Sequence, residues 1–510
     1  MKLNNIFQFA QTNITCLRRV SSINTRAVSS SDADPTFVPK SWDEIPGPTS
    51  LPLVGQLHHF LPGGSLYKFE GVRLHRHLYK TYGPIVKLKG LLGGPDNVLL
   101  FDAESSAEVF RSENVLPKRP GFFSLEYYRK VVKKQKSKND KFTGLITDHG
   151  IRWKELRSTV NPVMMQPKSI KDFTAPLDEI VQQVIVRIKS LRNKDNMIER
   201  KFNEEVMLWM LESFGLIAFG IRLNCFDPNL PEDSAERKLI ESIHSFFTVL
   251  DKLDFKPSIW RYYPTRTFKR AMQIFETVEY ASEELMNKAV KNLNNNNNSN
   301  REKGIIEKLL EIDKNMAVFI ASDLLFGGID TVGNMMIAIF YLLANNPEKQ
   351  HKLRVELRSK GDRRQYLRAC IKETMRLLPV TFGNMRETSK EYNLLGYNIP
   401  KNTYVITCHQ YMSLMECHYP RPQEYIPERW LVDKNDPLYY GNAHPFAMST
   451  FGYGARACVG RRVAELEMEL FLTRIIENFH ITWVGGPMNI KPSLVNYAVG
   501  PFNFVFKDVE

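Results

Sequence analysis

A short loop that ends in a cysteine limits the possible folds of this chain more than any other feature. The run Phe451-Gly452-Tyr453-Gly454-Ala455-Arg456-Ala457-Cys458-Val459-Gly460 places three glycines around one cysteine, where an amphipathic helix predicted from Val459 to Phe479 begins. Glycine permits unusual backbone angles and lets amide N–H groups approach whatever the loop holds. A helix N-terminus favours a thiolate, which is the form of cysteine that binds metal. The loop predicts a thiolate ligand, Cys458, and the alternative is a buried structural cysteine in a tight turn.

A lone thiolate surrounded by amide donors is the way in which haem iron is held by proteins that cleave an O–O bond. The amide donors tune how strongly the sulfur donates electrons to the iron. Arg456 would then reach a haem propionate. The other cysteines are scattered and show no C-x-x-C spacing, so neither a disulfide framework nor a zinc site is expected: Cys16, Cys225, Cys370, Cys408 and Cys417.

The composition is that of a soluble globular protein with a large core. The chain has 510 residues, of which 43% are hydrophobic and 25% charged, which excludes intrinsic disorder and a multi-span membrane protein. The pattern is mostly helical, with hairpins predicted within Tyr392 to Cys408. The longest apolar stretch, Met316 to Ala344, contains Asp323 and Asp330. Charges at mid-span are costly in lipid, so this stretch is expected to be a helix buried in protein.

Two further motifs follow the order seen in one enzyme family. Glu373-Thr374-Met375-Arg376 is an E-x-x-R whose Glu and Arg share a helix face, and Pro427-Glu428-Arg429-Trp430 lies downstream of it. Together with the cysteine loop, these motifs strongly resemble the cytochrome P-450 family, and the resemblance covers most of the chain. It implies that Glu373 and Arg376 pair with Arg429 to support the cysteine loop. The connection between Glu356 and Tyr366 is shorter than is usual in the family.

The resemblance assigns the long buried helix to the oxygen-binding side. Gly327-Gly328-Ile329-Asp330-Thr331 lies within it, and two glycines weaken a helix by roughly 1 kcal/mol each relative to alanine. In the family this segment crosses the distal haem face, and its acid–alcohol pair, here Asp330 and Thr331, delivers protons to bound dioxygen. The alternative is a buried helix kinked by glycine for packing.

The same resemblance assigns the haem and substrate contacts. Trp153-Lys154-Glu155-Leu156-Arg157 matches the W-x-x-x-R that binds a propionate, and Arg386, seven residues after Pro379, occupies the other propionate position. Phe451 and Gly460 complete the cofactor-binding loop. The residues implied to lie near the substrate could equally be core: Phe122, Phe123, Phe326, Val380, Thr381 and Phe382.

The first thirty-one residues resemble a targeting segment. Residues 1–31 contain Lys2, Arg18, Arg19 and Arg26, several serines and no acidic residue, which is typical of a mitochondrial transit peptide. The alternative is an ordinary frayed terminus. Without these residues the chain, whose net charge is +13, stays basic. No nucleic-acid-binding motif is present, so an anionic membrane face or an acidic partner is favoured.

The resemblance implies an external electron source, because no flavin or nicotinamide domain is expected in this chain. Mitochondrial members receive electrons from an acidic [2Fe–2S] ferredoxin served by an NADPH-dependent reductase. Here the docking patch would be Arg368, Lys372, Arg461 and Arg462, and the alternative is a solvated basic face. The expected location is the matrix side of the inner mitochondrial membrane, with peripheral association.

The predicted fold is mainly α with a small β portion, a single large domain of the cytochrome P-450 fold enclosing haem b (iron protoporphyrin IX). The expected divisions are 1–31 for the transit peptide, 32–55 for a proline-rich segment and 56–510 for the haem-thiolate monooxygenase domain. The implied reaction inserts one oxygen atom of O2 into a hydrophobic small molecule. Tyr366-Leu367-Arg368-Ala369-Cys370 and Gly383-Asn384 resemble the insect-type, xenobiotic-metabolising mitochondrial branch most.

Two rival functions stay open. One is a steroid (ecdysteroid-type) hormone hydroxylase of the same clan. The other is a haem-thiolate protein that binds ligands without oxygenating them. Asp330 and Thr331 argue against the second rival, because a pure binder has no need of a proton relay.

Overall fold

Helices form most of the part of the chain that the computed structural model describes, which comprises residues 38–52, 54–90, 94–133, 142–198, 202–295, 303–359 and 363–509. The predicted transit peptide 1–31 lies outside these residues. The helices are α2 (Gly71–Tyr82), α3 (Ala103–Arg111), α4 (Phe123–Tyr127), α6 (Gly150–Met165), α7 (Pro167–Lys171), α8 (Thr174–Leu191), α9 (Phe202–Phe219), α10 (Ala235–Leu250), α11 (Arg266–Asn295), α12 (Ile305–Leu310), α13 (Lys314–Ala344), α14 (Pro347–Arg358), α15 (Gln365–Leu377), α16 (His409–Met412) and α17 (Arg461–Asn478). Two π-helical turns, η3 (Tyr128–Lys133) and η4 (Asp251–Phe255), follow α4 and α10.

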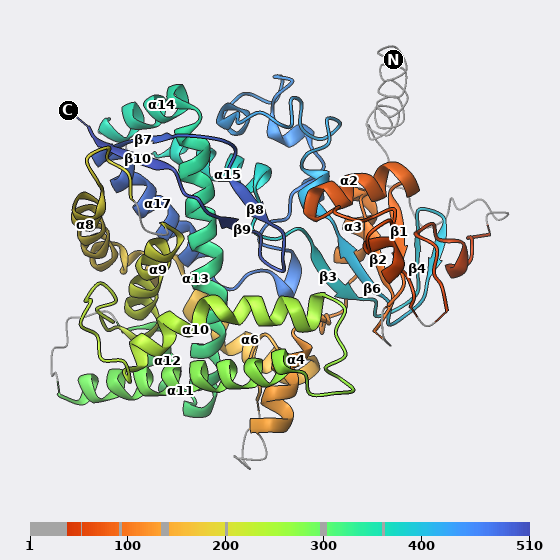
Figure 1. Ribbon diagram of the computed structural model, residues 1–510, viewed down its shortest axis with the longest axis horizontal. Helices are drawn as coiled ribbons and strands as arrows, with labels where there is room; N and C mark the ends of the chain where they lie inside the picture. Colours follow the sequence, from red (N-terminus) through yellow and green to blue (C-terminus); the bar gives the residue numbers. More distant parts are fainter. Residues whose placement is uncertain are drawn as a thin grey trace.

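In the described part of the chain the strands form one four-stranded sheet and three two-stranded sheets, β4–β5, β8–β9 and β7–β10. The sheet has the order β1-β2-β6-β3, in which β2 and β6 run parallel and the other neighbours antiparallel. It lies beside α2 and α3 at one end of the molecule, away from most of the helices (Figure 1). The strands are β1 (Ile85–Leu88), β2 (Asn97–Leu100), β3 (Asn384–Glu387), β4 (Tyr392–Leu394), β5 (Tyr397–Ile399), β6 (Tyr404–Thr407), β7 (Phe479–Trp483), β8 (Asn489–Lys491), β9 (Tyr497–Val499) and β10 (Phe504–Asp508).

Helix α13 runs through the middle of the helical region (Figure 1). Its N-terminus is capped by Asp313, whose carboxylate accepts from the Met316 N–H at 2.9 Å, and it ends just before Asn345-Asn346-Pro347. A helix that is apolar on all sides belongs in a protein interior. In the described part of the chain, its Met316–Ala344 segment alone is long and apolar enough to cross a membrane, yet most of it is buried inside the protein. The predicted buried helix therefore matches α13.

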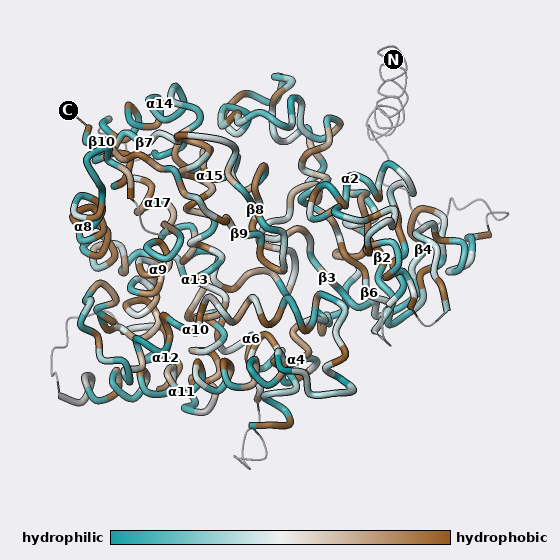
Figure 2. Tube along the Cα trace, in the orientation of Figure 1, coloured by the Kyte–Doolittle hydropathy of each residue, from teal (hydrophilic) through white to brown (hydrophobic). Residues whose placement is uncertain are grey.

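The hydrophobic core lies between α13 and the helices around it. Its largest cluster includes Trp209, Phe340 and Phe471, all nearly inaccessible to solvent. Helix α14 lies at the edge of the molecule and is drawn mainly in the hydrophilic colour of Figure 2. A smaller cluster around Val98 and Val405 holds the sheet together.

The junction between α14 and α15 is closed by one carboxylate. Glu356, near the end of α14, accepts from the Tyr366 N–H at 2.7 Å and from the Leu367 N–H at 2.8 Å. These are two of the free amide donors in the first turn of α15, and capping them stabilises the helix start. Helix α15 begins at Gln365, directly after this junction.

Candidate active site and cofactor cavity

A cavity of about 420 Å³ lies against α13 and reaches the cysteine loop. Its wall contains residues of α6, α10, α13, β3 and α17, together with the loops that precede α4 and α17. Most of the residues predicted for the site line it: Phe122, Trp153, Arg157, Phe326, Thr331, Val380, Thr381, Phe382, Phe451, Arg456, Cys458 and Gly460.

Glycine backbone angles shape the cysteine loop as the sequence predicted. Gly452 and Gly454 have φ values of 71° and 67°, in the left-handed region that other residues rarely adopt. A side chain at Gly452 would also bring a Cβ within 3.2 Å of Asn384 Oδ1. The loop closes through a hydrogen bond from the Cys458 N–H to the Phe451 carbonyl at 2.8 Å. The thiol is thereby fixed three residues before α17 begins at Arg461.

The Cys458 side chain is exposed and lines the cavity. Burial raises the pKa of the thiol above its ordinary value. The Gly460 N–H and the guanidinium groups of Arg157, Arg119 and Arg461 act in the opposite direction, because each favours a negative sulfur. Among the described cysteines, Cys225, Cys370 and Cys408 are buried and line no part of this cavity.

Three arginines border the cavity near the thiol. Arg119 and Arg157 each have a buried Nε atom without a hydrogen-bond partner. The Arg456 guanidinium stacks 3.7 Å from the Trp153 ring centroid and donates to the carbonyls of Pro117 and Asp148. Burial, and then the neighbouring arginines, lower its pKa to about 8.

Such a group of buried cations is complementary to an anion. A buried charge without a partner is costly, and guanidinium groups bind carboxylates well. The donor set therefore fits the two carboxylates of a haem, and the single thiol fits its iron. Arg119, Arg157 and Arg456 are the residues that could hold the propionates, and Cys458 is the residue that could hold the metal.

Arg386, which was predicted to bind the second propionate, lies outside the cavity wall. It belongs to β3 but does not line the cavity. Its guanidinium forms a salt bridge with Glu113 and donates to the Tyr453 carbonyl at 3.1 Å. Arg119, which the sequence reasoning did not select, lines the cavity instead. Its position before Pro120 carries no local signal, because only the folding of this loop against the cysteine loop brings it there.

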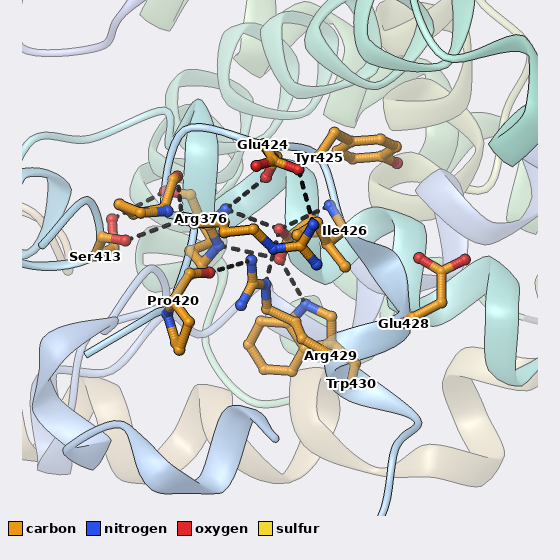
Figure 3. A network of polar contacts seen from close by, with 12 residues as sticks. Arg376, Ser413, Pro420, Glu424, Tyr425, Ile426, Glu428, Arg429 and Trp430 are labelled. Atoms are coloured by element: carbon orange, nitrogen blue, oxygen red, sulfur yellow. Dashed lines mark hydrogen bonds and ion pairs between the residues drawn. The ribbon is translucent and has the colours of Figure 1, made fainter. Parts of the chain in front are cut away.

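The E-x-x-R helix and the P-E-R-W turn meet in a buried network (Figure 3). The Glu373 carboxylate accepts from Arg376 Nη2 at 2.7 Å, from Arg429 Nε at 3.0 Å and from the Trp430 indole N–H at 2.9 Å. The side chains of Glu373, Arg376 and Arg429 are completely buried. Arg376 also donates to the carbonyls of Ser413, Pro422 and Glu424. One carboxylate thus joins α15 to the chain that leads toward the cysteine loop.

On α13, Thr331 lines the cavity and its hydroxyl donates to the Gly327 carbonyl at 2.5 Å. Gly327 and Gly328 also line the cavity, so the backbone is accessible on this face of the helix. Asp330 does not line the cavity. Its buried side chain faces a second, smaller chamber. Consecutive residues on a helix point about 100° apart, so the acid and the alcohol lie on different faces.

The wall away from the cysteine is strongly apolar. Apart from Phe451 of the cysteine loop, seven phenylalanines line the cavity, namely Phe122, Phe214, Phe246, Phe247, Phe255, Phe326 and Phe382. Phe123, predicted beside Phe122, does not line it, because the chain turns there and its ring lies 4.8 Å from the Arg261 guanidinium. The one acidic residue of α13 that lines the cavity, Asp323, already binds Arg129 at 2.6 Å and the Ile146 N–H at 3.1 Å.

Glu467 is a cavity residue that the sequence reasoning missed. It belongs to α17, two turns after the cysteine loop, and burial alone raises its pKa to about 8. Glu467 lies on the same helix face as Val463 and Ala464, which also line the cavity. The spacing of these residues along the predicted helix after Cys458 could have indicated this position.

The predicted docking residues are exposed, but three of them have partners within the chain. Arg368 binds Glu469 through two hydrogen bonds of 2.8 and 3.2 Å, and Arg461 binds Glu465 at 2.9 Å. The Lys372 ammonium lies 5.7 Å from the Trp430 ring centroid. Arg462 is exposed at the start of α17.

Comparisons with known proteins agree with this geometry. A family model described as Cytochrome P450 matches residues 45–497. Cytochrome P450 CYP12A2 of Musca domestica is 32% identical over 505 residues, which cover 93% of this chain and 94% of that protein. Probable cytochrome P450 12b2, mitochondrial, of Drosophila melanogaster is 32% identical over 489 residues, covering 92% of this chain and 90% of the relative.

Solved structures show the same fold. The retinoic acid-bound cyanobacterial CYP120A1 matches with a TM-score of 0.72 at 19% identity, over 92% of this chain and 100% of that chain. The predicted mainly α fold, the resemblance to insect mitochondrial P450s and the assignment as a monooxygenase are confirmed. The chain belongs to the cytochrome P450 family.

Proposed function

We propose that Cys458 ligates the iron of haem b and that this monooxygenase inserts one oxygen atom of O2 into a hydrophobic small molecule, with a xenobiotic as the favoured substrate. The observation that carries the proposal is the position of the Cys458 thiol, which faces the same cavity as Thr331 and a wall of phenylalanines. A proline-rich segment 32–55 precedes the haem-thiolate monooxygenase domain 56–510 in this proposal.

Each group of residues then has a physical task. Arg119, Arg157 and Arg456 neutralise the propionates and orient the macrocycle, and the Gly460 N–H moderates the charge on the sulfur. The buried Glu373 network holds the chain that leads to the cysteine loop. Arg386 supports this side indirectly, through Glu113 and the Tyr453 carbonyl. When bound, the haem supplies the redox centre at which O2 is activated.

The residues of α13 handle protons in this proposal. The Thr331 hydroxyl can leave the Gly327 carbonyl and bind a group in the cavity. Asp330, whose pKa burial raises to about 7, is able to gain and lose a proton near neutral pH. The phenylalanine wall excludes water from the remaining space, which limits loss of protons to side reactions.

The apolar wall supports a xenobiotic over a polyhydroxylated steroid. Each hydroxyl group that leaves water without a new hydrogen bond costs about 1–3 kcal/mol. Seven cavity-lining phenylalanines provide no such partner, and the carboxylate of Asp323 is already engaged. Binding titrations with a panel of aromatic xenobiotics and ecdysteroids test this preference. Tighter binding of the ecdysteroids would make the hormone hydroxylase the better assignment.

Electrons come from a [2Fe–2S] ferredoxin and its NADPH-dependent reductase in this proposal, with the protein associated peripherally with the matrix side of the inner mitochondrial membrane. The support is that several relatives are named as mitochondrial and that Arg368, Lys372, Arg461 and Arg462 lie exposed near the cysteine loop or the Glu373 helix. Opposite charges would steer the acidic ferredoxin toward this face.

The proposed iron ligand can be tested directly with the CO difference spectrum of the dithionite-reduced protein. The wild type should show the far-red-shifted Soret band of thiolate-ligated haem, and Cys458→Ala should lose it. Cys408→Ala is the matched control, because Cys408 is buried and lines no part of the cavity. A histidine-type band in both the wild type and Cys458→Ala would refute the proposal. NADPH consumption without hydroxylated product from any substrate would favour the rival function of ligand binding.

A further inference from the structure

A second chamber, of about 30 Å³, lies on a different face of α13 from Thr331, on the side of Asp330. The residues that bring polar groups to its wall are Asp330 and Asn334 of α13, Asn203 of α9, Thr248 of α10 and Tyr497 of β9. Phe247 and Val495 line both this chamber and the main cavity, so the two spaces are neighbours separated by these side chains and by the helix.

Two oxygen atoms in this chamber have no hydrogen-bond partner. Asp330 Oδ1 and Asn203 Oδ1 are both buried and unpaired, and Asp330 as a whole is only 5% exposed. Leaving a buried acceptor unsatisfied costs about 1–3 kcal/mol. Asn334 does not donate to Asp330 Oδ1: its amide donates to the Asp330 backbone carbonyl at 2.8 Å and accepts from the Ala498 N–H at 3.1 Å.

A water molecule has the hydrogen-bonding pattern that these two acceptors require. It carries two donors, and a polar chamber of this size is large enough for one or two waters. Buried waters in proteins characteristically satisfy groups of this kind. An ammonium or guanidinium group is not available for the task, because no basic side chain lines the chamber in the described part of the chain.

The electrostatic surroundings isolate Asp330 from other charges. The elements packed against it, α9, α10 and the segment with β9, bring one other titratable group to the chamber, Tyr497. Burial alone therefore raises the pKa of Asp330, with no contribution from a neighbouring charge. A hydrogen-bonded water would stabilise the ionised carboxylate.

We propose that this chamber holds a water molecule that donates to Asp330 Oδ1 and Asn203 Oδ1 and returns a proton to Asp330 in each catalytic cycle. Asn203 is then a positioning residue for the monooxygenase reaction. This inference rests on the proposed function, because it gives the proton relay its source. Asp330 gives up its proton to the relay of the proposed function and becomes a carboxylate. The chamber water then protonates the carboxylate and takes a replacement proton from bulk solvent, so that protons and charge balance.

The arrangement separates the proton supply from the substrate. Protons enter from the side of α9 and β9, while the substrate occupies the apolar cavity along a different face of α13. A bound substrate that fills the cavity would therefore leave the proton supply intact.

The proposal is tested with Asn203→Leu, which keeps the volume of the side chain but cannot bind the water. The primary measurement is an infrared titration of the Asp330 carboxyl band in the haem-loaded protein, identified by its loss in Asp330→Asn. We expect the midpoint in Asn203→Leu to rise by about one pH unit, a tenfold change in proton affinity, because the carboxylate loses its donor. The share of electrons lost as peroxide should also increase several-fold, while substrate affinity stays unchanged.

Asn161→Leu is the matched control. Asn161 Oδ1 is also buried and unpaired, but Asn161 lines neither cavity, so its substitution should leave the Asp330 midpoint unchanged. Asn203→Asp serves as a second variant, in which a like charge facing Asp330 should raise the midpoint further. An Asp330 midpoint that is the same in wild type, Asn203→Leu and Asn203→Asp would overturn the inference. The titration needs no turnover, so its outcome is independent of the CO spectrum that tests the proposed function.

Discussion

Two carboxyl groups that are buried without a charged partner make this protein sensitive to pH. Asp330 and Glu467 both belong to this class, one in the small chamber and the other in the wall of the main cavity. Burial is the cause of the raised pKa in each case. Such groups fold most favourably in the neutral form, so each ties the stability of the protein to proton concentration.

Glu467 provides a measurable case. Its pKa rises from an ordinary 4.5 to about 8 in the folded protein, so the folded state binds a proton that the unfolded state has released over this interval. The contribution of the neutral carboxyl to stability is complete below about pH 4.5 and is lost as the pH rises through about 8. Over this window the free energy of unfolding should fall less in Glu467→Gln than in the wild type. The difference should be about 1.4 kcal/mol for each unit by which burial raises the pKa of Glu467.

Urea denaturation of the haem-loaded protein at several pH values measures this difference. Glu465→Gln is the control, because Glu465 belongs to the same helix but pairs with Arg461 at the surface. It should keep the pH dependence of the wild type. Parallel stability curves for Glu467→Gln and wild type would contradict the prediction.

At the scale of elements, one buried arginine joins parts of the chain that are distant in sequence. Arg129 of η3 binds Glu279 of α11 at 2.9 Å, Asp323 of α13 at 2.6 Å and the Thr143 carbonyl at 2.8 Å. A further bond of 3.2 Å reaches the hydroxyl of Ser322. Every nitrogen atom of the guanidinium therefore has a partner. Through Thr143 and Asp323, Arg129 joins the segment that precedes α6 to the part of α13 that lines the cavity.

Arg129→Met should destabilise the protein by about 3–5 kcal/mol, because it leaves the buried carboxylate of Asp323 without its counter-charge. The measurement is the free energy of unfolding in urea at neutral pH. Arg237→Ala removes an exposed pair with Glu241 on α10, and it should cost no more than about 0.5 kcal/mol. If both substitutions had the same small effect, the buried network would contribute no more than a surface pair.

Local sequence patterns predicted the elements whose signals lie within a few residues. The helix after the cysteine loop was predicted from Val459 to Phe479 and is α17, Arg461–Asn478, because the amphipathic period and the flanking glycine mark its limits. The hairpin β4–β5 also follows from local turn residues. The other strand in that region, β6, pairs instead with β2 and β3, which no local pattern could reveal.

The candidate-site residues also fall into two groups, those that a local motif predicts and those that no local motif predicts. Cys458 and the Glu373 helix stand out because their motifs have fixed spacing. Arg119, Glu467 and Asn203 have no motif, and only the packing of distant elements brings them to a cavity. The different faces of Asp330 and Thr331 could have been expected from helix geometry, whereas the chamber behind Asp330 depends on α9 and β9.

At the scale of the whole molecule, an excess of basic residues favours an acidic partner. The net charge is +13, and Arg462 lies exposed at the start of α17, immediately after the cysteine loop. Arg462→Glu should raise the KM for the proposed ferredoxin partner several-fold and flatten its dependence on salt, because a steering charge is reversed. Steady-state turnover at varied ferredoxin and ionic strength measures both effects.

Lys80→Glu is the matched control for this charge reversal. Lys80 is exposed on α2, beside the sheet at the other end of the molecule from α17 (Figure 1). It should leave the KM for ferredoxin unchanged, and both variants should keep the CO spectrum of the wild type. Equal effects of the two substitutions would mean that net charge, and not this face, attracts the partner.

The mixed sheet has a consequence for how the chain reaches its final shape. Leu99 of β2 pairs with Ile406 of β6, so roughly 300 residues separate two adjacent strands. The N-terminus leaves the ribosome first, and it also leads when a chain passes through a translocation pore. The β1–β2 hairpin can therefore form early. One edge of β2 then stays open until β6 appears, and an open strand edge invites pairing with other chains. Maturation therefore has a vulnerable interval, and an edge-covering chaperone would be most useful before Tyr404–Thr407 arrives.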